Sequence, residues 1–214
     1  MKKNVMGSVL AGVVFAGAMS CGAASGQYSA RISVTGQLEK ERDSSKNEST
    51  KSTAKTKSES QHFDLKVTVA NTGKEEASFD LEYYFFARHL TSDGDKGEPV
   101  LVQKGNEAVT LAGMSRDTIP VVSSSLSWSE TKTTSSGNSN NNSSSSSQKK
   151  TVSGSVYDGY VMLLRADGEI VAKYSPDRKL LTDEAIASLA TATVSAAAPA
   201  KSGAKQAGGK RKKK

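Results

Sequence analysis

Residues 77–88, with the sequence ASFDLEYYFFAR, decide the fold of this 214-residue chain. Apolar and polar side chains alternate along the stretch with a period of two, which is typical of a half-buried β-strand. Tyr84 and Phe86 interrupt the polar face, so we expect another element to cover that end of the strand. The apolar face carries Ala77, Phe79, Leu81, Tyr83, Phe85 and Ala87.

Further strands are predicted on both sides of this stretch. Upstream, residues 63–70 alternate strictly before an Asn-Thr-Gly turn, and residues 27–38 alternate roughly. Downstream, Asp167-Gly168 between two apolar runs is a strong signal for a β-hairpin. The other predicted strands are 100–103, 108–111, 118–122, 156–165 and 170–174. Seven or eight short strands separated by turns predict an all-β, two-sheet sandwich over residues 27–176.

Two short motifs flank the aromatic strand: LKVTVANTG at residues 65–73 and VTLAGMS at residues 109–115. With these motifs, the region 63–122 resembles the immunoglobulin-like domains of bacterial extracytoplasmic proteins, of the CARDB and fibronectin III-like type. The resemblance implies an immunoglobulin-like β-sandwich. In that topology alternate connections leave at the same end, so the polar segments 40–60, 91–99 and 129–150 would share one pole. This expectation depends on how 100–111 is counted, because one strand more or fewer there moves 129–150 to the opposite end.

Two of these polar segments, 40–60 and 129–150, are of low complexity. The first consists mainly of Lys, Glu, Ser and Thr, and the second is rich in Ser, Asn and Thr. Neither holds enough apolar side chains to offset the entropy that is lost on ordering. Because their flanks are extended in character, we interpret each as a long polar hairpin inserted in the sandwich.

A short C-terminal α-helix is predicted within residues 177–192. Thr182 is a suitable N-cap, and the two acidic residues that follow it suit the positive end of the helix dipole. Apolar residues then recur on one stripe at helical spacing. We expect this stripe to dock on the protruding aromatic pair, which gives a docking face of Tyr84, Phe86, Ile186 and Leu189.

Residues 1–24 have the layout of a secretory signal peptide, with two lysines, an apolar run and a stretch of small residues. Cleavage near residue 24 gives a soluble exported protein. A lipoprotein signal that ends at residue 20 makes Cys21 a lipidation site and the expected membrane tether. An uncleaved anchor is the third alternative. All three predict export to the periplasm, the outer membrane or the extracellular space. Since Cys21 is the single cysteine, internal disulfides are excluded.

Residues 193–214 are predicted to be a disordered linker and a basic tail. The net charge is +7, from 29 basic and 22 acidic residues, and seven of the basic residues lie in 201–214. The tail is a candidate for salt-sensitive binding to an anionic surface. Specific nucleic-acid recognition is not expected, because no aromatic residue is present there for base stacking. The candidate polyanion-binding residues are Lys210, Arg211, Lys212, Lys213 and Lys214.

No catalytic, metal or cofactor site is predicted. The two histidines, His62 and His89, lie at strand edges and are far apart in sequence. Asp80 and Glu82 share one face of a strand, as any outward residues two positions apart do. The loop DGDKGE at 93–98 departs from the calcium-binding EF-hand pattern.

These features predict an exported, non-enzymatic binding or scaffolding module of a bacterial cell envelope. It would display polar loops to an envelope protein or glycan. The alternative is a polyanion-binding accessory protein that acts through its Lys/Arg-rich C-terminal tail.

Overall fold

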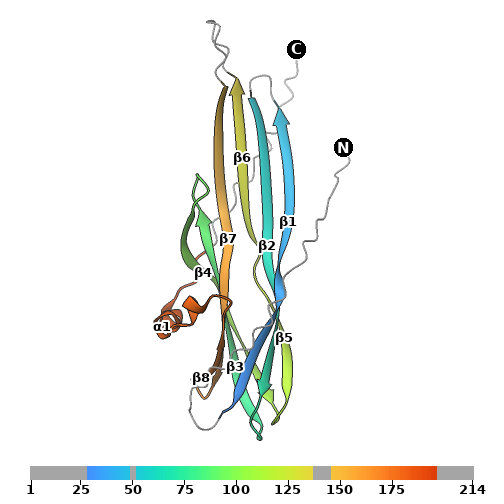
Figure 1. Cartoon of the computed structure of the whole chain (residues 1–214), viewed down its shortest axis with the longest axis vertical. Helices are drawn as coiled ribbons and strands as arrows, with labels where there is room; N and C mark the ends of the chain where they lie inside the picture. Colours follow the sequence, from blue (N-terminus) through green and yellow to red (C-terminus); the bar gives the residue numbers. More distant parts are fainter. Residues whose placement is uncertain (1–27, 49–51, 137–145, 197–214) are drawn as a thin grey trace, which may run out of the picture.

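The computed structural model describes residues 28–48, 52–136 and 146–196, which form eight antiparallel strands and one short α-helix (Figure 1). The strands are β1 (Ala30–Glu48), β2 (Ser52–Asn71), β3 (Ala77–Leu90), β4 (Lys96–Leu111), β5 (Arg116–Val122), β6 (Leu126–Ser136), β7 (Ser146–Ala166) and β8 (Glu169–Tyr174). A 3₁₀-helix (Arg178–Leu181) and α1 (Asp183–Thr191) follow them. The predicted all-β, sandwich-like class is confirmed.

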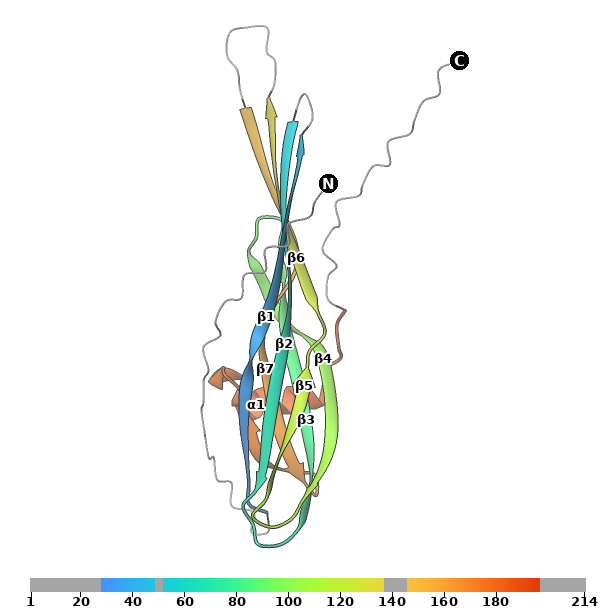
Figure 2. The same ribbon diagram turned by 90° about the vertical axis from the view of Figure 1, so that its right-hand side faces the viewer.

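The lower part of the molecule in Figure 1 is a sandwich of two layers, which we call the body. One layer pairs β1, β2 and β5, and the other is ordered β4–β3–β7–β8. In Figure 2 the layer with β1, β2 and β5 faces the viewer, and α1 lies behind the sandwich. The helix therefore covers the outer face of the second layer.

In the upper part, β1, β2, β6 and β7 continue as a single four-stranded sheet in that order (Figure 1). We call this sheet the extension; it comprises residues 39–48, 52–61, 127–136 and 146–153. β7 joins the two parts, because its first half pairs with β6 and its second half pairs with β3. Segment 40–60 thus continues the body strands β1 and β2, whereas segment 129–150 joins β6, which pairs only at the level of the extension, to the body strand β7. Their tips, 49–51 and 137–145, lie outside the described residues.

The hydrophobic core lies between the two layers of the body. The strict alternation of β2 and β3 turns their apolar side chains to one side, where they meet those of β7. The largest side chains that are fully buried in this core are Leu65, Val67, Val69, Phe79, Leu81, Phe85, Met162 and Leu164.

One predicted turn is absent from the described structure. The sequence suggested two short strands at 100–103 and 108–111, separated by Gly105-Asn106, and this prediction was wrong: β4 runs through both without interruption. Gly105 lies directly opposite Tyr83 on β3. A Cβ atom at Gly105 would lie 2.3 Å from the Tyr83 ring, so the glycine leaves room for an aromatic side chain rather than for a turn.

The β3–β4 hairpin points towards the same end of the molecule as the extension (Figure 1). It stops at the base of the extension, where the amide of Val152 donates to the carbonyl of Ser92 at 3.0 Å. The three polar connections expected at one pole therefore lie towards the same end. Segments 40–60 and 129–150 reach far beyond segment 91–99.

The C-terminal segment packs on the outer face of β3 and β7. Its first turn is a 3₁₀-helix, and α1 begins after Thr182, whose hydroxyl accepts a hydrogen bond from the amide of Ala185 at 3.2 Å. A second, smaller apolar cluster joins the helix to the sheet. Its buried members are Tyr84, Leu101, Val161, Leu163, Ile186 and Leu189, with Phe86 packed against them.

We expect the double variant I186A/L189A to release α1 while the body stays folded. A nine-residue helix is marginal on its own, so its stability depends on this apolar contact. Hydrogen exchange should show that the amides of 185–191 lose protection, whereas β2 and β3 keep theirs. The control is S188A, since Ser188 is exposed on the same helix. Unchanged protection of α1 in the double variant would contradict the docking contact.

Candidate functional site

The extension presents two faces to solvent, and its strand pairing shows which side chains share each face. Residues that lie directly opposite each other in antiparallel strands point to the same side. Arg42, Glu59 and Trp128 are such a set, and every second residue along each strand joins them. We call this side the charged face. The opposite side, which includes Thr56 and Thr131, is the hydroxyl face.

The charged face carries more positive than negative side chains. Its three acidic residues are Glu48, Glu59 and Glu130. Its seven basic residues are Lys40, Arg42, Lys46, Lys55, Lys57, Lys132 and Lys150. The described part of the face therefore has a formal charge of +4, seven less three, although the chain without its tail is close to neutral.

Ion pairs organise the lower half of this face. Glu59 is only 7% exposed and accepts from Arg42 Nε at 2.7 Å, with Lys40 Nζ at 3.7 Å. Glu130 lies 3.2 Å from Lys150 Nζ and 3.3 Å from Lys132 Nζ. The hydrogen bond from Lys150, followed by that from Lys132, lowers the pKa of Glu130, which keeps this carboxylate ionised.

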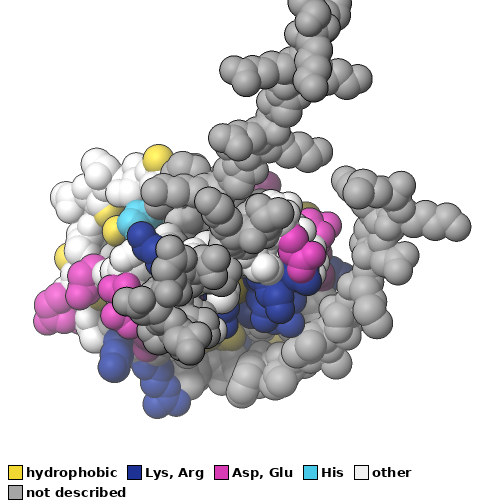
Figure 3. All heavy atoms as spheres, turned by 90° about the horizontal axis from the view of Figure 1, so that it is seen from above, with side chains coloured by type: hydrophobic (Ala, Val, Ile, Leu, Met, Phe, Trp, Pro, Cys, Tyr) yellow, Lys and Arg dark blue, Asp and Glu magenta, His cyan; other side chains and the backbone are white. Residues whose placement is uncertain are grey.

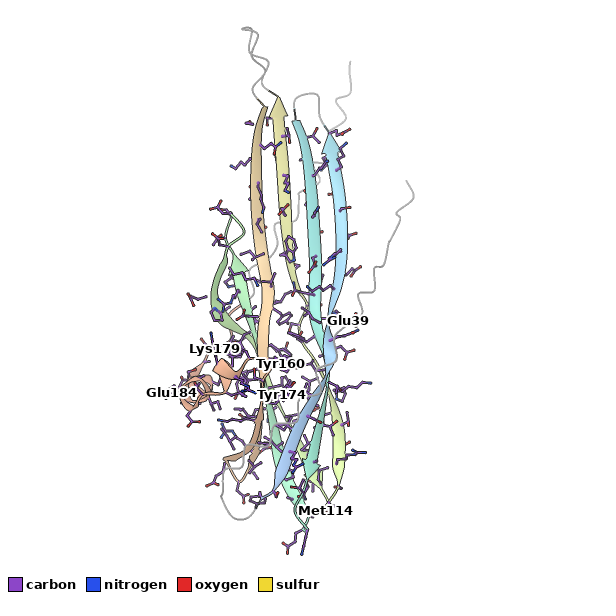
Figure 4. All side chains as sticks on the ribbon, viewed as in Figure 1. Glu39, Met114, Tyr160, Tyr174, Lys179 and Glu184 are labelled. Atoms are coloured by element: carbon purple, nitrogen blue, oxygen red, sulfur yellow. The ribbon has the colours of Figure 1, made fainter. Side chains whose placement is uncertain are left out.

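The hydroxyl face is built from serine and threonine with an acidic edge. Thr56 and Thr131 pair through their hydroxyls at 3.2 Å, as do Ser129 and Ser153. Glu39, Glu41 and Asp43 line the β1 edge, and Figure 4 marks Glu39 where β1 enters the extension. The hydroxyl side chains of this face are Ser45, Thr56, Ser58, Ser60, Ser127, Ser129, Thr131, Thr133, Ser135, Ser147, Thr151 and Ser153.

An open groove of about 360 Å³ lies where the charged face meets the β3–β4 hairpin. Trp128, the single tryptophan of the chain, lines it together with Tyr157. Lys40, Glu59, Gln61, Glu130 and Lys150 also line the groove, and Leu90, Gly94 and Lys96 do so from the hairpin. An indole beside charged and amide groups suits a polar ligand with an apolar face, such as a sugar.

Seen from the tip of the extension, the visible described atoms include groups of Lys and Arg and of Asp and Glu side chains and only a few hydrophobic ones (Figure 3). Figure 4 shows that Tyr160 and Tyr174 lie together within the body, in agreement with their stacked rings at 6.2 Å. Lys179 and Glu184 lie on the helical side of the body, and Met114, 76% exposed, lies at its lower end. The extension is therefore set apart in composition from the aromatic interior of the body.

The predicted docking residues Tyr84, Phe86, Ile186 and Leu189 come together in the second apolar cluster. Burial, and then the hydrogen bond to Glu82 at 3.0 Å, raises the pKa of Tyr84 to about 12. This phenol is therefore neutral at physiological pH and packs as an apolar ring. The predicted lipidation site, Cys21, and the tail residues Lys210–Lys214 lie outside the described residues.

Two of the other chemical candidates, Glu82 and His89, have structural partners. Glu82 pairs with Arg165 at 3.1 Å, while Asp80 is exposed. His89 Nδ1 lies 2.8 Å from Ser155 Oγ at the join between the two parts. Among the described residues, no three His, Cys, Asp or Glu side chains are grouped so that they could hold a metal ion. In the same part of the chain, no helix has the length and apolarity that a membrane span requires.

Sequence reasoning missed the charged face. Its signal is a period of two in charge instead of in hydrophobicity: Lys55, Lys57 and Glu59 alternate with hydroxyl residues, and Glu130 and Lys132 do the same. Composition alone hides this alternation, because it describes both segments only as polar.

No family model matches the chain, and no curated protein matches it. Among solved structures, the chain is similar to one described as a putative beta-galactosidase from Bacteroides fragilis, at 16% sequence identity and a TM-score of 0.26. The match covers 63% of this chain and 15% of the length of that protein. A TM-score of this size carries no argument about fold or function.

Proposed function

We propose that this protein is an exported, non-enzymatic binding or scaffolding module of the bacterial cell envelope, with the four-stranded extension as its contact surface. The observation that carries the proposal is that the extension continues body strands β1, β2 and β7, joined by β6, far beyond the hydrophobic core, with both faces polar. Export rests on the composition of residues 1–24. The partner is an envelope protein or glycan.

The physical argument starts from what the extension contributes to stability. Ordering a residue costs roughly 1–2 kcal/mol of backbone entropy, and burial of apolar surface is the main compensation. Among the described residues of the extension, the one buried apolar side chain is that of Val152, near its base. A polar sheet held away from the core is suited to contact with a partner, because recognition sites commonly project from a stable scaffold.

Removing the end of the extension should abolish binding to the envelope and leave the body intact. In the variant, Ser45 is joined to Thr56, and Thr131 to Thr151, each through an Asn-Gly turn. These residues are directly paired in the sheet, so the remaining register is preserved. We expect co-sedimentation with isolated bacterial cell walls to be lost. The melting temperature should fall by less than about 4 °C, because the core lies below the deletion.

The matched control removes residues 201–214 and keeps the extension. If the shortened extension sediments as the full chain does, the proposal is wrong. If only the tail deletion abolishes sedimentation, the alternative of a polyanion-binding accessory protein acting through Lys210–Lys214 replaces it.

A further inference from the structure

Four lysines lie in one row across all four strands of the extension. Lys46 pairs with Lys55, Lys55 with Lys132, and Lys132 with Lys150, so the row crosses β1, β2, β6 and β7 on the charged face. We call it the lysine row. Neighbouring strands are about 4.8 Å apart, so the backbone positions of the row span about 14 Å.

The row is unfavourable for the stability of the sheet. Like charges directly opposite each other destabilise a strand pair. Two carboxylates offset part of this repulsion: Glu48 forms an ion pair with Lys46, and Glu130 forms ion pairs with Lys132 and Lys150. Among the described residues, Lys55 makes no ion pair, and neither does Lys57 in the adjacent row. The ammonium groups therefore retain positive charge available to a ligand.

The lysine side chains are accessible. Those of Lys46, Lys132 and Lys150 are 54%, 61% and 49% exposed, and Lys55 is also exposed. Lysine is a flexible point charge, which fits repeated anionic groups without a fixed bidentate geometry. A line of such charges across four neighbouring strands matches an extended polymer better than a compact anion.

We propose that the lysine row binds a linear anionic polysaccharide, which lies across the strands of the extension. The inference rests on the proposed function and names the ligand class of that surface. The rows on either side are polar except for Val152, so the surface offers little apolar area for insertion into a lipid layer. Aromatic platforms for nucleic-acid bases are likewise scarce, since Trp128 is the one aromatic side chain on the described charged face.

The groove at the base of the extension supports a sugar polymer. Lys150 belongs to the row and also lines the groove with Trp128. Trp128 and Lys132 are four residues apart on β6, which is about 13 Å along a strand. Because this separation runs along the strands, a polymer that lies across them at the row contacts Trp128 only where it turns towards the base of the extension.

The test measures binding of fluorescein-labelled dextran sulfate to the full chain by fluorescence anisotropy at low salt, with neutral dextran as the control ligand. The row variant is K46Q/K55Q/K132Q/K150Q. Each exposed ionic contact contributes up to about fivefold in affinity, so we expect the row variant to bind roughly 30-fold more weakly. Its affinity should also depend less steeply on salt concentration.

The matched control is K66Q/K74Q/K149Q/K179Q, which removes the same charge from exposed lysines outside the row. It should bind within about threefold of the full chain, because no adjacent set of cations is lost. A third variant neutralises the five tail residues 210–214. The melting temperature of the row variant should stay close to that of the full chain, because the relief of like-charge repulsion offsets the loss of the exposed ion pairs to Glu48 and Glu130.

If the row and control variants lose equal affinity for dextran sulfate, unspecific charge attraction replaces the proposal. If only the tail variant loses affinity, the tail is the binding site instead of the row. Tighter, row-dependent binding of single-stranded DNA or anionic-lipid vesicles would replace the polysaccharide. If the shortened extension fails to bind cell walls while the row variant still binds them, the binding module stands and the ligand class is wrong.

Discussion

Replacing Phe85 by alanine should lower the free energy of unfolding by about 3–5 kcal/mol, the usual cost of removing a buried aromatic side chain. Phe85 is fully buried, and the rings of Phe63, Tyr157 and Tyr160 lie 5.9, 6.2 and 6.1 Å from its own. Truncation leaves a cavity that these rings cannot fill without leaving their positions. Urea titration gives the free energy, and the melting temperature should fall by about 6–20 °C for a protein of this size.

The matched control is F86A, the same substitution one residue further along β3. Phe86 points to the opposite face, where it is partly buried against the cluster that holds α1. We expect a loss of about 1–2 kcal/mol, because this side chain is less buried and packs on a smaller cluster. If F85A and F86A lowered the free energy of unfolding equally, the placement of the main core on the Phe85 side would be contradicted.

The aromatic group around Phe85 also supports the surface that we propose for binding. The backbone amide of Tyr157 donates to Gln61 Oε1 at 3.2 Å, and both residues line the groove beside Trp128. The side chain of Gln61 is thereby held at the base of the extension. Loss of the Phe85 ring should therefore disturb the base of the extension as well as the core.

Much of the body could be predicted from the sequence, because its signals are local. The alternation in β3 fixes which side chains face the core, and the left-handed backbone of Asp167 and Gly168 forms the expected turn between β7 and β8. Thr182 caps α1, as its hydroxyl and the following acidic residues indicate. In each case the residues that decide the structure are neighbours in the sequence.

The extension could not be predicted to the same degree, because its organisation depends on the register of distant strands. Lys46 and Lys150 belong to one row only because β1, β2, β6 and β7 pair with a particular alignment. A shift of one residue in any strand would move its lysine to the hydroxyl face. A polar segment has no apolar pattern to reveal that alignment. The alignment of the strands is determined instead by the core of the body, which fixes where each strand begins.

The join between body and extension depends on Gly154. At this residue β7 leaves β6 and approaches β3: Gly154 is the last partner of β6, and Ser155 is the first partner of β3. Its φ is +113°, a conformation that side chains rarely adopt. A Cβ atom there would lie 2.3 Å from the carbonyl oxygen of Ser127 and 2.5 Å from Cα of Trp128. Both are backbone atoms of β6, which cannot move without disturbing the pairing.

We therefore expect G154A to lower the free energy of unfolding by at least about 3 kcal/mol, from backbone strain of about 1–3 kcal/mol together with the displacement of β6. Two further glycines separate these contributions. Gly168 has φ +83°, but a Cβ atom added there would have no neighbouring atom within 4 Å, so G168A should show the strain alone, about 1 kcal/mol. Gly159, on β7, would meet only Leu180 Cδ1 at 3.6 Å, so G159A should change stability by less than about 1 kcal/mol.

Urea titration of G154A, G168A and G159A gives the loss of unfolding free energy in each variant. The order of these three losses tests how the extension is attached to the body. If G154A costs no more than G168A, then backbone conformation alone accounts for the glycine, and β6 does not approach β7 as closely as described. If G154A costs much more, the close approach is real. The indole of Trp128 lies on the strand that would have to move, so its fluorescence should then change in G154A and stay constant in G168A and G159A. In that case G154A would also change the shape of the groove, because Trp128 pairs with Gly154 and lines the groove.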